Sequence, residues 1–254
     1  MFIFKIKPVL TIVLASVFLL CCSNHLAPED TDKPPYPHGR QLSSAERKEI
    51  TNNFLKKIRV PILNSLPVVE DHTNAHFRTN IEVARRCLIL FSLISVAKNQ
   101  MTGIEAIGYL KKYKLWVNVA PSEAEYLKNA NRPKQADIDI SWQIERLNVL
   151  LWALNIIDTL PLPLKECDFT NYKNLPDAKN NPLNWIENTR LRSKEDILNE
   201  TDLIYRIHWA TTEARLHNQP MPYNFNNDVV FERHFALNWL VVYSENWDDI
   251  TTDT

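Results

Sequence analysis

Glycine is scarce in this chain, which has only 3 glycines among its 254 residues. At the average usage of about 7%, a chain of this length holds roughly 18. A shortage on this scale removes most of the tight turns that strand-rich folds need and most of the loops that wrap phosphate groups. The composition therefore argues strongly against a Rossmann-type fold and against a P-loop nucleotide enzyme.

An excess of positive charge is also missing. Lysine and arginine number 29 and aspartate and glutamate 30, which gives a formal net charge of -1. Proteins that bind nucleic acid carry a basic patch or stripe, so we expect no nucleic-acid partner. By contrast, 45% of the residues are hydrophobic and 7 are tryptophan, which is enough for one or two packed cores.

The N-terminus has the layout of an export signal. Lys5 and Lys7 precede an uncharged apolar stretch, Pro8 to Leu20, which is followed by Cys21 and Cys22. The stretch is shorter than the about 20 residues that span a bilayer as a helix, so a permanent membrane anchor is the weaker interpretation. A signal that is cleaved without lipidation is the other alternative.

The end of this segment resembles a bacterial lipobox, in which the cysteine after the cleavage site is acylated. On this interpretation residues 1–21 are a signal peptide and Cys22 carries palmitate-type acyl chains. Loss of Lys5 and Lys7 then changes the formal charge from -1 to -3. We expect a lipid-anchored protein of the cell envelope that faces the periplasm from the outer membrane. Its partners are then the membrane, through the lipid, and an envelope protein.

Helix-start signals dominate the rest of the chain. A hydroxyl residue stands three positions before a glutamate four times, the spacing at which both side chains cap backbone N–H groups at the start of a helix. These pairs are Ser43 with Glu46, Thr79 with Glu82, Thr102 with Glu105, and Ser122 with Glu125. They predict an all-α fold, a single compact multi-helix bundle over residues 43–254, which a proline-rich tether at 22–42 joins to the lipid.

Helices are predicted at residues 44–59, 79–98, 102–113, 121–129, 139–157, 194–217 and 227–244. Prolines in residues 60–70 leave room for at most one short strand or hairpin, and a proline-rich loop is expected at 158–184. Cys87 falls inside a helix and Cys167 in that loop. We favour two unpaired thiols over a disulfide, and neither cysteine has the spacing of a zinc site.

Several charged residues stand on helices that are apolar around most of their circumference. Glu145 shares a helical face with Trp142 and Trp152, and an unpaired carboxylate buried there would cost several kcal/mol. Either a cation meets Glu145 or its pKa rises. The predicted helix at 194–217 offers Arg206, which lies four residues after Asp202 and can pair with it.

The same helix places Trp209 and Glu213 on the face of Arg206 and turns His208 to the opposite side. Glu213 lies two turns from Arg206, so we expect it to need another partner. In the helix at 227–244, Glu232 and Trp239 share one face, His234 and Asn238 share another, and Arg233 lies between apolar neighbours. We therefore predict that Arg206 or Arg233 meets Glu145, Glu213 or Glu232 inside the bundle.

Two interpretations of these residues stay open. In the structural one, buried ion pairs fix the register of the helices. In the functional one, a cleft holds catalytic candidates and ligand-binding candidates. The catalytic candidates are Glu145, Glu213, Glu232 and His234, and the ligand-binding candidates are Trp142, Arg206, Trp209, Arg233 and Trp239. No metal or cofactor is expected, because HExxH pairs and a GxSxG elbow are missing.

Long blocks in the second half of the chain resemble one family. They run from Ser141 to Leu154, from Asp202 to Ala210, from Glu232 to Leu240, and from Trp247 to the C-terminus. They are similar to an uncharacterised, mainly bacterial family, domain of unknown function 4272, over about residues 75–254. The resemblance implies that Trp142, Glu145, Arg206, Trp209, Glu232, Arg233 and Trp239 form one spatial cluster, but it brings no activity, substrate or cofactor.

The sequence thus favours a lipid-anchored binding or assembly module. One alternative is a hydrolase-like or anion-binding enzyme that uses the buried Glu, Arg and His residues. Another is an immunity-type module that neutralises a toxin, for which an acidic face would be needed against a basic toxin.

Overall fold

A computed structural model describes residues 36–37, 39–167, 175–176 and 181–254. This part of the chain is built of helices and contains no strand, so the all-α prediction is confirmed. The α-helices are α1 (Ser44–Lys57), α2 (Asn80–Ala97), α3 (Gly103–Lys112), α4 (Pro121–Lys128), α5 (Lys134–Trp142), α6 (Ile144–Ala153), α7 (Leu183–Asn188), α8 (Lys194–Leu216) and α9 (Asn227–Leu240). The 3-10 turns are η1 (Trp116–Asn118), η3 (Pro222–Asn224) and η4 (Trp247–Asp249). The predicted signal peptide, Cys22 and most of the tether lie outside the described residues.

Three of the four predicted capping boxes are confirmed, those at Ser43, Thr79 and Thr102. The fourth is wrong, because α4 begins after Ala120, and the Ala120 N–H donates to the carboxylate of Glu123 over 2.8 Å. Ser122 instead donates from both its backbone N–H and its hydroxyl to Asp248. The hydroxyl therefore joins the start of α4 to the C-terminal segment.

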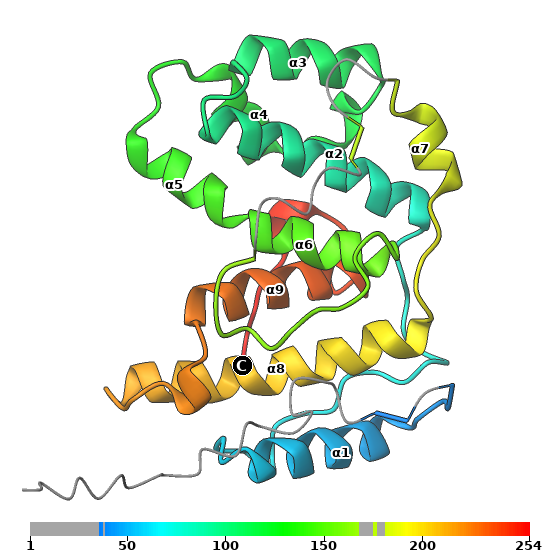
Figure 1. Cartoon of the computed structure of the whole chain (residues 1–254), viewed down its shortest axis with the longest axis vertical. Coiled ribbons are helices and arrows are strands. Elements are labelled where there is room, and N and C mark those ends of the chain that lie inside the picture. The colour runs from blue at the N-terminus through cyan, green and yellow to red at the C-terminus, as the bar shows by residue number, and fades with distance from the viewer. Residues whose placement is uncertain (1–35, 38, 168–174, 177–180) are drawn as a thin grey trace, which may run out of the picture. The chain divides into compact units, whose positions relative to one another are not determined.

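The predicted helix at 139–157 is two helices. Gln143 has φ -62° and ψ -3°, and its N–H donates to the carbonyl of Ile140, three residues back, over 3.1 Å. This tight turn ends α5 at Trp142 and starts α6 in a new direction, so Trp142 and Glu145 do not share a continuous helical face (Figure 1). The helix predicted to reach residue 244 ends at Leu240, because Val242 adopts a left-handed φ of 54°.

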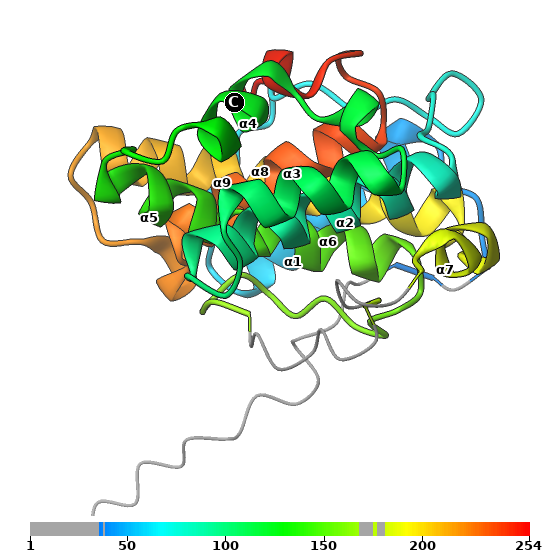
Figure 2. The ribbon, with the colours of Figure 1, turned by 90° about the horizontal axis from the view of Figure 1, so that it is seen from above.

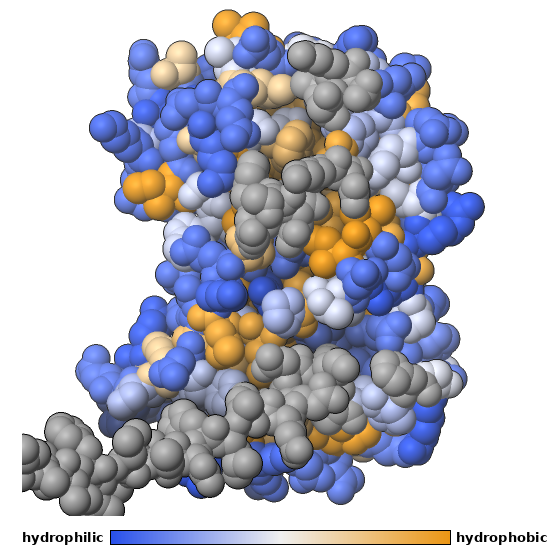
Figure 3. Space-filling model, in the orientation of Figure 1, coloured by the Kyte–Doolittle hydropathy of each residue, from blue (hydrophilic) through white to orange (hydrophobic). Residues whose placement is uncertain are grey.

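The helices lie in successive layers. In Figure 1, α1, α8, α9, α6, α2 and α3 follow one another from bottom to top, and each packs against the next. Figure 2 shows the segment after α9, coloured red, along one side of these layers and the loop at 158–167 along the other. The face drawn in Figure 3 is mostly hydrophilic, with hydrophobic residues gathered around the middle layers.

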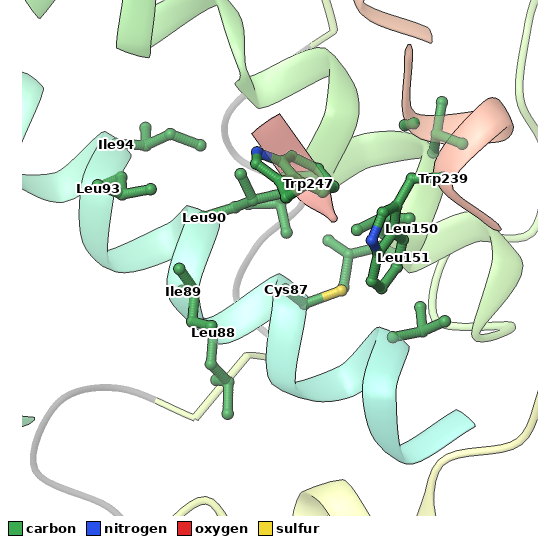
Figure 4. Close-up of a cluster of buried hydrophobic side chains, with 14 of the residues drawn as sticks. Cys87, Leu88, Ile89, Leu90, Leu93, Ile94, Leu150, Leu151, Trp239 and Trp247 are labelled. Atoms are coloured by element: carbon green, nitrogen blue, oxygen red, sulfur yellow. The ribbon is translucent and has the colours of Figure 1, made fainter. Parts of the chain in front are cut away.

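Two hydrophobic clusters form the core. The larger joins α2, α6 and α9 and includes Cys87, Leu88, Leu151 and Trp239 (Figure 4). The smaller joins α1, α8 and α9 through residues such as Leu55, Ile207 and Val230. No disulfide joins Cys87 to Cys167 in this structure. Many of the buried charged residues lie on α6, α8 and α9, the helices that connect the two clusters.

Candidate functional site

The predicted pairing of Glu145 is confirmed. Arg233 of α9 donates from Nε to Glu145 of α6 over 3.1 Å, and both side chains are almost completely buried. The other oxygen of Glu145 accepts the backbone N–H of Cys167, and Nη1 of Arg233 donates to the carbonyl of Pro161. The ion pair therefore fastens the loop at 158–167 to the helices, which is a structural task.

A second carboxylate lies near Arg233. Glu200 of α8 is 3% exposed, and within the described part of the chain it makes no hydrogen bond or ion pair. Burial raises the pKa of Glu200 to about 7, although the charge of Arg233 acts in the opposite direction. A carboxyl group without a partner in an apolar setting is expensive when ionised.

Glu232 has a partner that the sequence analysis did not select. Arg146 of α6 donates from Nε to Glu232, and its guanidinium also lies 3.6 Å from the ring centroid of Phe235. Burial raises the pKa of Glu232, and the charge of Arg146 opposes that shift. The sequence signal that could have identified Arg146 is its position directly after Glu145, as a second charged residue on an apolar helix.

The predicted pair on α8 is also present. Arg206 donates to both oxygens of Asp202, and Asp202 accepts a further bond from the hydroxyl of Thr51 on α1. Nη2 of Arg206 reaches the carbonyl of Pro67. These bonds attach α1 and the segment after it to α8. Glu213 pairs elsewhere, as expected, with His217 at the surface over 3.1 Å.

The seven residues that the resemblance placed in one cluster are distributed over separate groups. Glu145 and Arg233 hold the loop at 158–167, Glu232 pairs with Arg146, and Arg206 faces α1. The three tryptophans lie apart: Trp142 is half-buried at the end of α5, Trp209 packs on the smaller hydrophobic cluster, and Trp239 belongs to the larger one. The expectation that these seven residues form one cluster is therefore wrong. The break at Gln143 separates Trp142 from Glu145, and the charged residues pair with partners on different elements.

Trp239 forms the floor of an open pocket of about 430 Å³. The pocket lies between the start of α2, residues 117–121 and residues 245–249, and we call it the acidic pocket. Trp247 packs edge-on against Trp239, with ring centroids 5.4 Å apart. The guanidinium of Arg86 lies 4.3 Å from the ring centroid of Trp247, and that of Arg78 lies 5.1 Å from the ring centroid of Trp239.

Both arginines are already engaged. Arg86 donates from Nη1 to both oxygens of Glu123 and from Nη2 to the carbonyl of Asn118. Arg78 donates to the backbone carbonyls of Trp239, Ser244 and Glu245. The two side chains therefore hold the C-terminal segment and the start of α4 in place, and the sequence analysis missed both. Arg86 was detectable as a charge within the apolar run of α2.

The rim of the acidic pocket carries four carboxylates, those of Glu82, Glu245, Asp248 and Asp249. Val117 stands beside them with 82% of its surface exposed. Arg78 already forms ion pairs with two of the four carboxylates, Glu82 at 3.5 Å and Glu245 at 3.4 Å. The two lining arginines are still outnumbered, so the pocket is net negative and has an apolar wall. Such a lining attracts a cation rather than an anion.

A second pocket, of about 560 Å³, is lined by His234, one of the catalytic candidates from the sequence. It lies between residues 67–70, α8, α9 and residues 241–243, and we call it the histidine pocket because His234 lines it. His234 is 2% exposed and its Nδ1 lies 2.8 Å from Nδ1 of His208. The two pockets share no lining residue, and Glu145, Glu213, Glu232, Arg206 and Arg233 line neither.

The described ranges contain no group of three or more His, Cys, Asp or Glu residues arranged to hold a metal ion. None of the helices in those ranges is both long and apolar enough to cross a membrane.

The fold and the sites define an all-α domain with buried ion pairs, an acidic pocket and a histidine pocket that share no lining residue. Residues 47–250 match the model of the family described as Domain of unknown function (DUF4272). The chain belongs to this family. Searches of curated proteins and of solved structures give no match.

Proposed function

We propose that the protein is a lipoprotein of the cell envelope, held by acyl chains on Cys22 and facing the periplasm from the outer membrane. The proposal is supported by Lys5, Lys7 and the apolar stretch that ends at the two cysteines. The proline-rich tether at 22–42 favours extended backbone, which rises about 3.1 Å per residue. The helical domain then stands up to roughly 60 Å from the bilayer.

A fatty acid with a clickable tag tests the anchor. Cells that express the wild-type chain should yield labelled protein, and Cys22→Ala should abolish the label because the acylated residue is lost. Cys21→Ala is the matched control and should stay labelled. Label that persists on Cys22→Ala would refute the assignment.

We further propose that the domain is a binding module for a basic segment of a partner protein, and that the acidic pocket receives it. One observation carries this: four carboxylates surround a floor of Trp239 and Trp247, beside the exposed Val117. A lysine or arginine side chain places its charge among the carboxylates and its apolar stem against Val117 and the floor.

The buried charged residues support a binding function better than a catalytic one. Glu145, Glu232, Arg206 and Arg233 are buried and paired, and none of them lines the acidic pocket or the histidine pocket. A general acid or base must reach its substrate, at most through one water molecule. These four side chains therefore support the structural interpretation.

Fluorescence anisotropy with a labelled hexalysine peptide tests the acidic pocket on the full-length protein in detergent. Reversal of two rim charges, Glu245→Lys with Asp249→Lys, should weaken binding about tenfold, since each exposed charge contact contributes up to about 1 kcal/mol. Glu49→Lys with Glu187→Lys changes the net charge equally on exposed positions outside the pocket. An equal loss in both double variants would show that the peptide reads overall charge and would refute the pocket.

A photo-crosslinking residue gives an independent check of location. At position 117 it should label the hexalysine peptide, whereas at position 104 it should not. Val117 and Ile104 are matched controls because they are 82% and 84% exposed. Equal labelling from both positions contradicts the proposal.

The acidic rim also favours the alternative that the partner is a basic toxin that the domain neutralises. In that case a toxin gene should stand beside the gene for this protein. Co-expression with the toxin should then protect cells, and the Glu245→Lys, Asp249→Lys variant should lose that protection.

A further inference from the structure

The histidine pocket lies apart from the acidic pocket and has a different character. Two residues of α8, Thr201 and Tyr205, and two of α9, His234 and Asn238, line it. Each pair is four residues apart and therefore shares one face of its helix. Tyr243, 59% exposed, stands at the opening on the C-terminal segment.

His234 has a ring nitrogen available to a ligand. Its Nδ1 is joined to Nδ1 of His208 over 2.8 Å, and among the described residues the ring makes no other hydrogen bond. Burial lowers the pKa of His234 to about 3 and that of His208 to about 4, so both rings are neutral at neutral pH. One ring then donates its Nδ1 proton and the other accepts it.

This coupling makes Nε2 of His234 adaptable. When His234 donates from Nδ1, its Nε2 is an acceptor, and when His208 donates, Nε2 of His234 carries the proton and becomes a donor. Transfer of one proton from Nε2 to Nδ1, with the matching exchange in His208, interconverts the two. The neutral pair thus suits a hydroxyl group, which donates and accepts.

Asn238 provides a second, oriented polar group. Its Nδ2 donates to the carbonyl of Thr251 over 2.8 Å, which fixes the amide, and its Oδ1 receives no hydrogen bond from the part of the chain that the structure describes. Asn238 is 7% exposed, so little of this side chain reaches water. A ligand hydroxyl that enters the pocket can donate to this oriented acceptor.

The lining excludes anions. It contains the carboxylates of Glu70 and Asp253 but no lysine or arginine, and its imidazole is neutral. Apart from Thr201 and Asn238, the remaining lining is apolar or phenolic and includes Leu198, Tyr205 and Tyr243. A fitting ligand is therefore uncharged, carries several hydroxyl groups and has a flat apolar face.

We propose that the histidine pocket binds a neutral sugar of one or two rings, with Nε2 of His234 and Oδ1 of Asn238 bonded to its hydroxyl groups and the phenol rings against its C–H face. The volume of about 560 Å³ is within the range of small-molecule sites. His208 acts as a positioning residue, because it sets which nitrogen of His234 bears the proton.

Calorimetric titration of the full-length protein with free sugars tests this, in a detergent that has no sugar headgroup. Glucose, galactose and mannose are the neutral probes, and glucuronate, galacturonate and mannuronate are their charged counterparts. At least one neutral sugar should bind at millimolar concentration, and its uronate should bind several-fold more weakly because two carboxylates face it. No binding by any neutral sugar, or equal binding by the uronate, would overturn the proposal.

Variants locate the binding. Tyr243→Ala removes an exposed ring without disturbing the core and should weaken the bound sugar several-fold, whereas Leu216→Ala, at a residue of similar exposure outside the pocket, should not. His234→Phe should weaken it about tenfold through loss of Nε2. The ¹⁵N shift of Nε2 of His234 should move on sugar addition in the wild type, and equal losses in Tyr243→Ala and Leu216→Ala would place the sugar elsewhere.

Discussion

Glu200 gives a stability prediction that can be worked through from its surroundings. Its carboxyl group is 3% exposed, lacks a hydrogen-bond partner among the described residues, and has a pKa raised from 4.5 to about 7 by burial. Glu200→Gln keeps the shape of the side chain and removes its ionisation. We expect the variant to be more stable than the wild type at pH 8 and equal to it at pH 4.

The sign follows from proton linkage. Below pH 4.5 the carboxyl group is protonated in both the folded and the unfolded chain and costs nothing. Between 4.5 and about 7 the unfolded chain releases the proton first, so the free energy of unfolding falls as the pH rises, by about 1.4 kcal/mol per pH unit. Above pH 7 the destabilisation by the ionised carboxylate is constant. Over the whole interval the free energy of unfolding falls by roughly 3 kcal/mol.

Urea unfolding of both proteins across this pH range measures the difference. His208 and His234, with their lowered pKa values, destabilise the fold at acid pH in both proteins alike, so the difference isolates Glu200. Glu187→Gln is the control at an exposed glutamate and should show no such profile. A Glu200→Gln protein that is less stable than the wild type at pH 8 would show that the ionised carboxylate stabilises the fold as a partner of Arg233, and would refute the reasoning.

Three further predictions concern packing and backbone, each measured by urea unfolding. Arg146→Met should cost about 3–5 kcal/mol because it leaves the buried Glu232 without a cation, and adding Glu232→Gln should recover part of that loss. Gly103→Ala should cost about 1–3 kcal/mol, because a methyl group at this position would lie 2.2 Å from the backbone oxygen of Leu127. Val242→Gly should instead add about 1 kcal/mol, because a β-branched residue is strained at φ 54°; a loss of stability there would contradict the strain.

The sequence predicted interactions that are local along the chain. Three capping boxes and the Asp202–Arg206 pair formed as expected, because partners three or four residues apart meet in any helix. The Glu145–Arg233 pair could also be predicted, because a buried carboxylate needs a cation and few arginines lie on the apolar helices.

Interactions that depend on how helices are placed could not be predicted in this way. Arg146 was assigned no partner because only the packing of α6 on α9 shows that it faces Glu232. No proline or glycine marks the break at Gln143 in the sequence. Because the apolar periodicity continues through this position, the pattern predicts a single helix. Both pockets combine segments far apart in the sequence, and neither has a motif.

The scarcity of glycine has a structural consequence that composition alone did not reveal. Helices commonly end in a left-handed residue, for which glycine is the least strained choice. Among the residues that the structure describes, six helices end that way without glycine. Asparagine follows α2, α6 and α8, at Asn99, Asn155 and Asn218, and Arg59, Lys114 and Val242 follow α1, α3 and α9. Asparagine tolerates this conformation, whereas valine does so at a cost of about 1–2 kcal/mol. The strained end of α9 is also the edge of the histidine pocket, because Val242 lines that pocket beside Val241 and Tyr243.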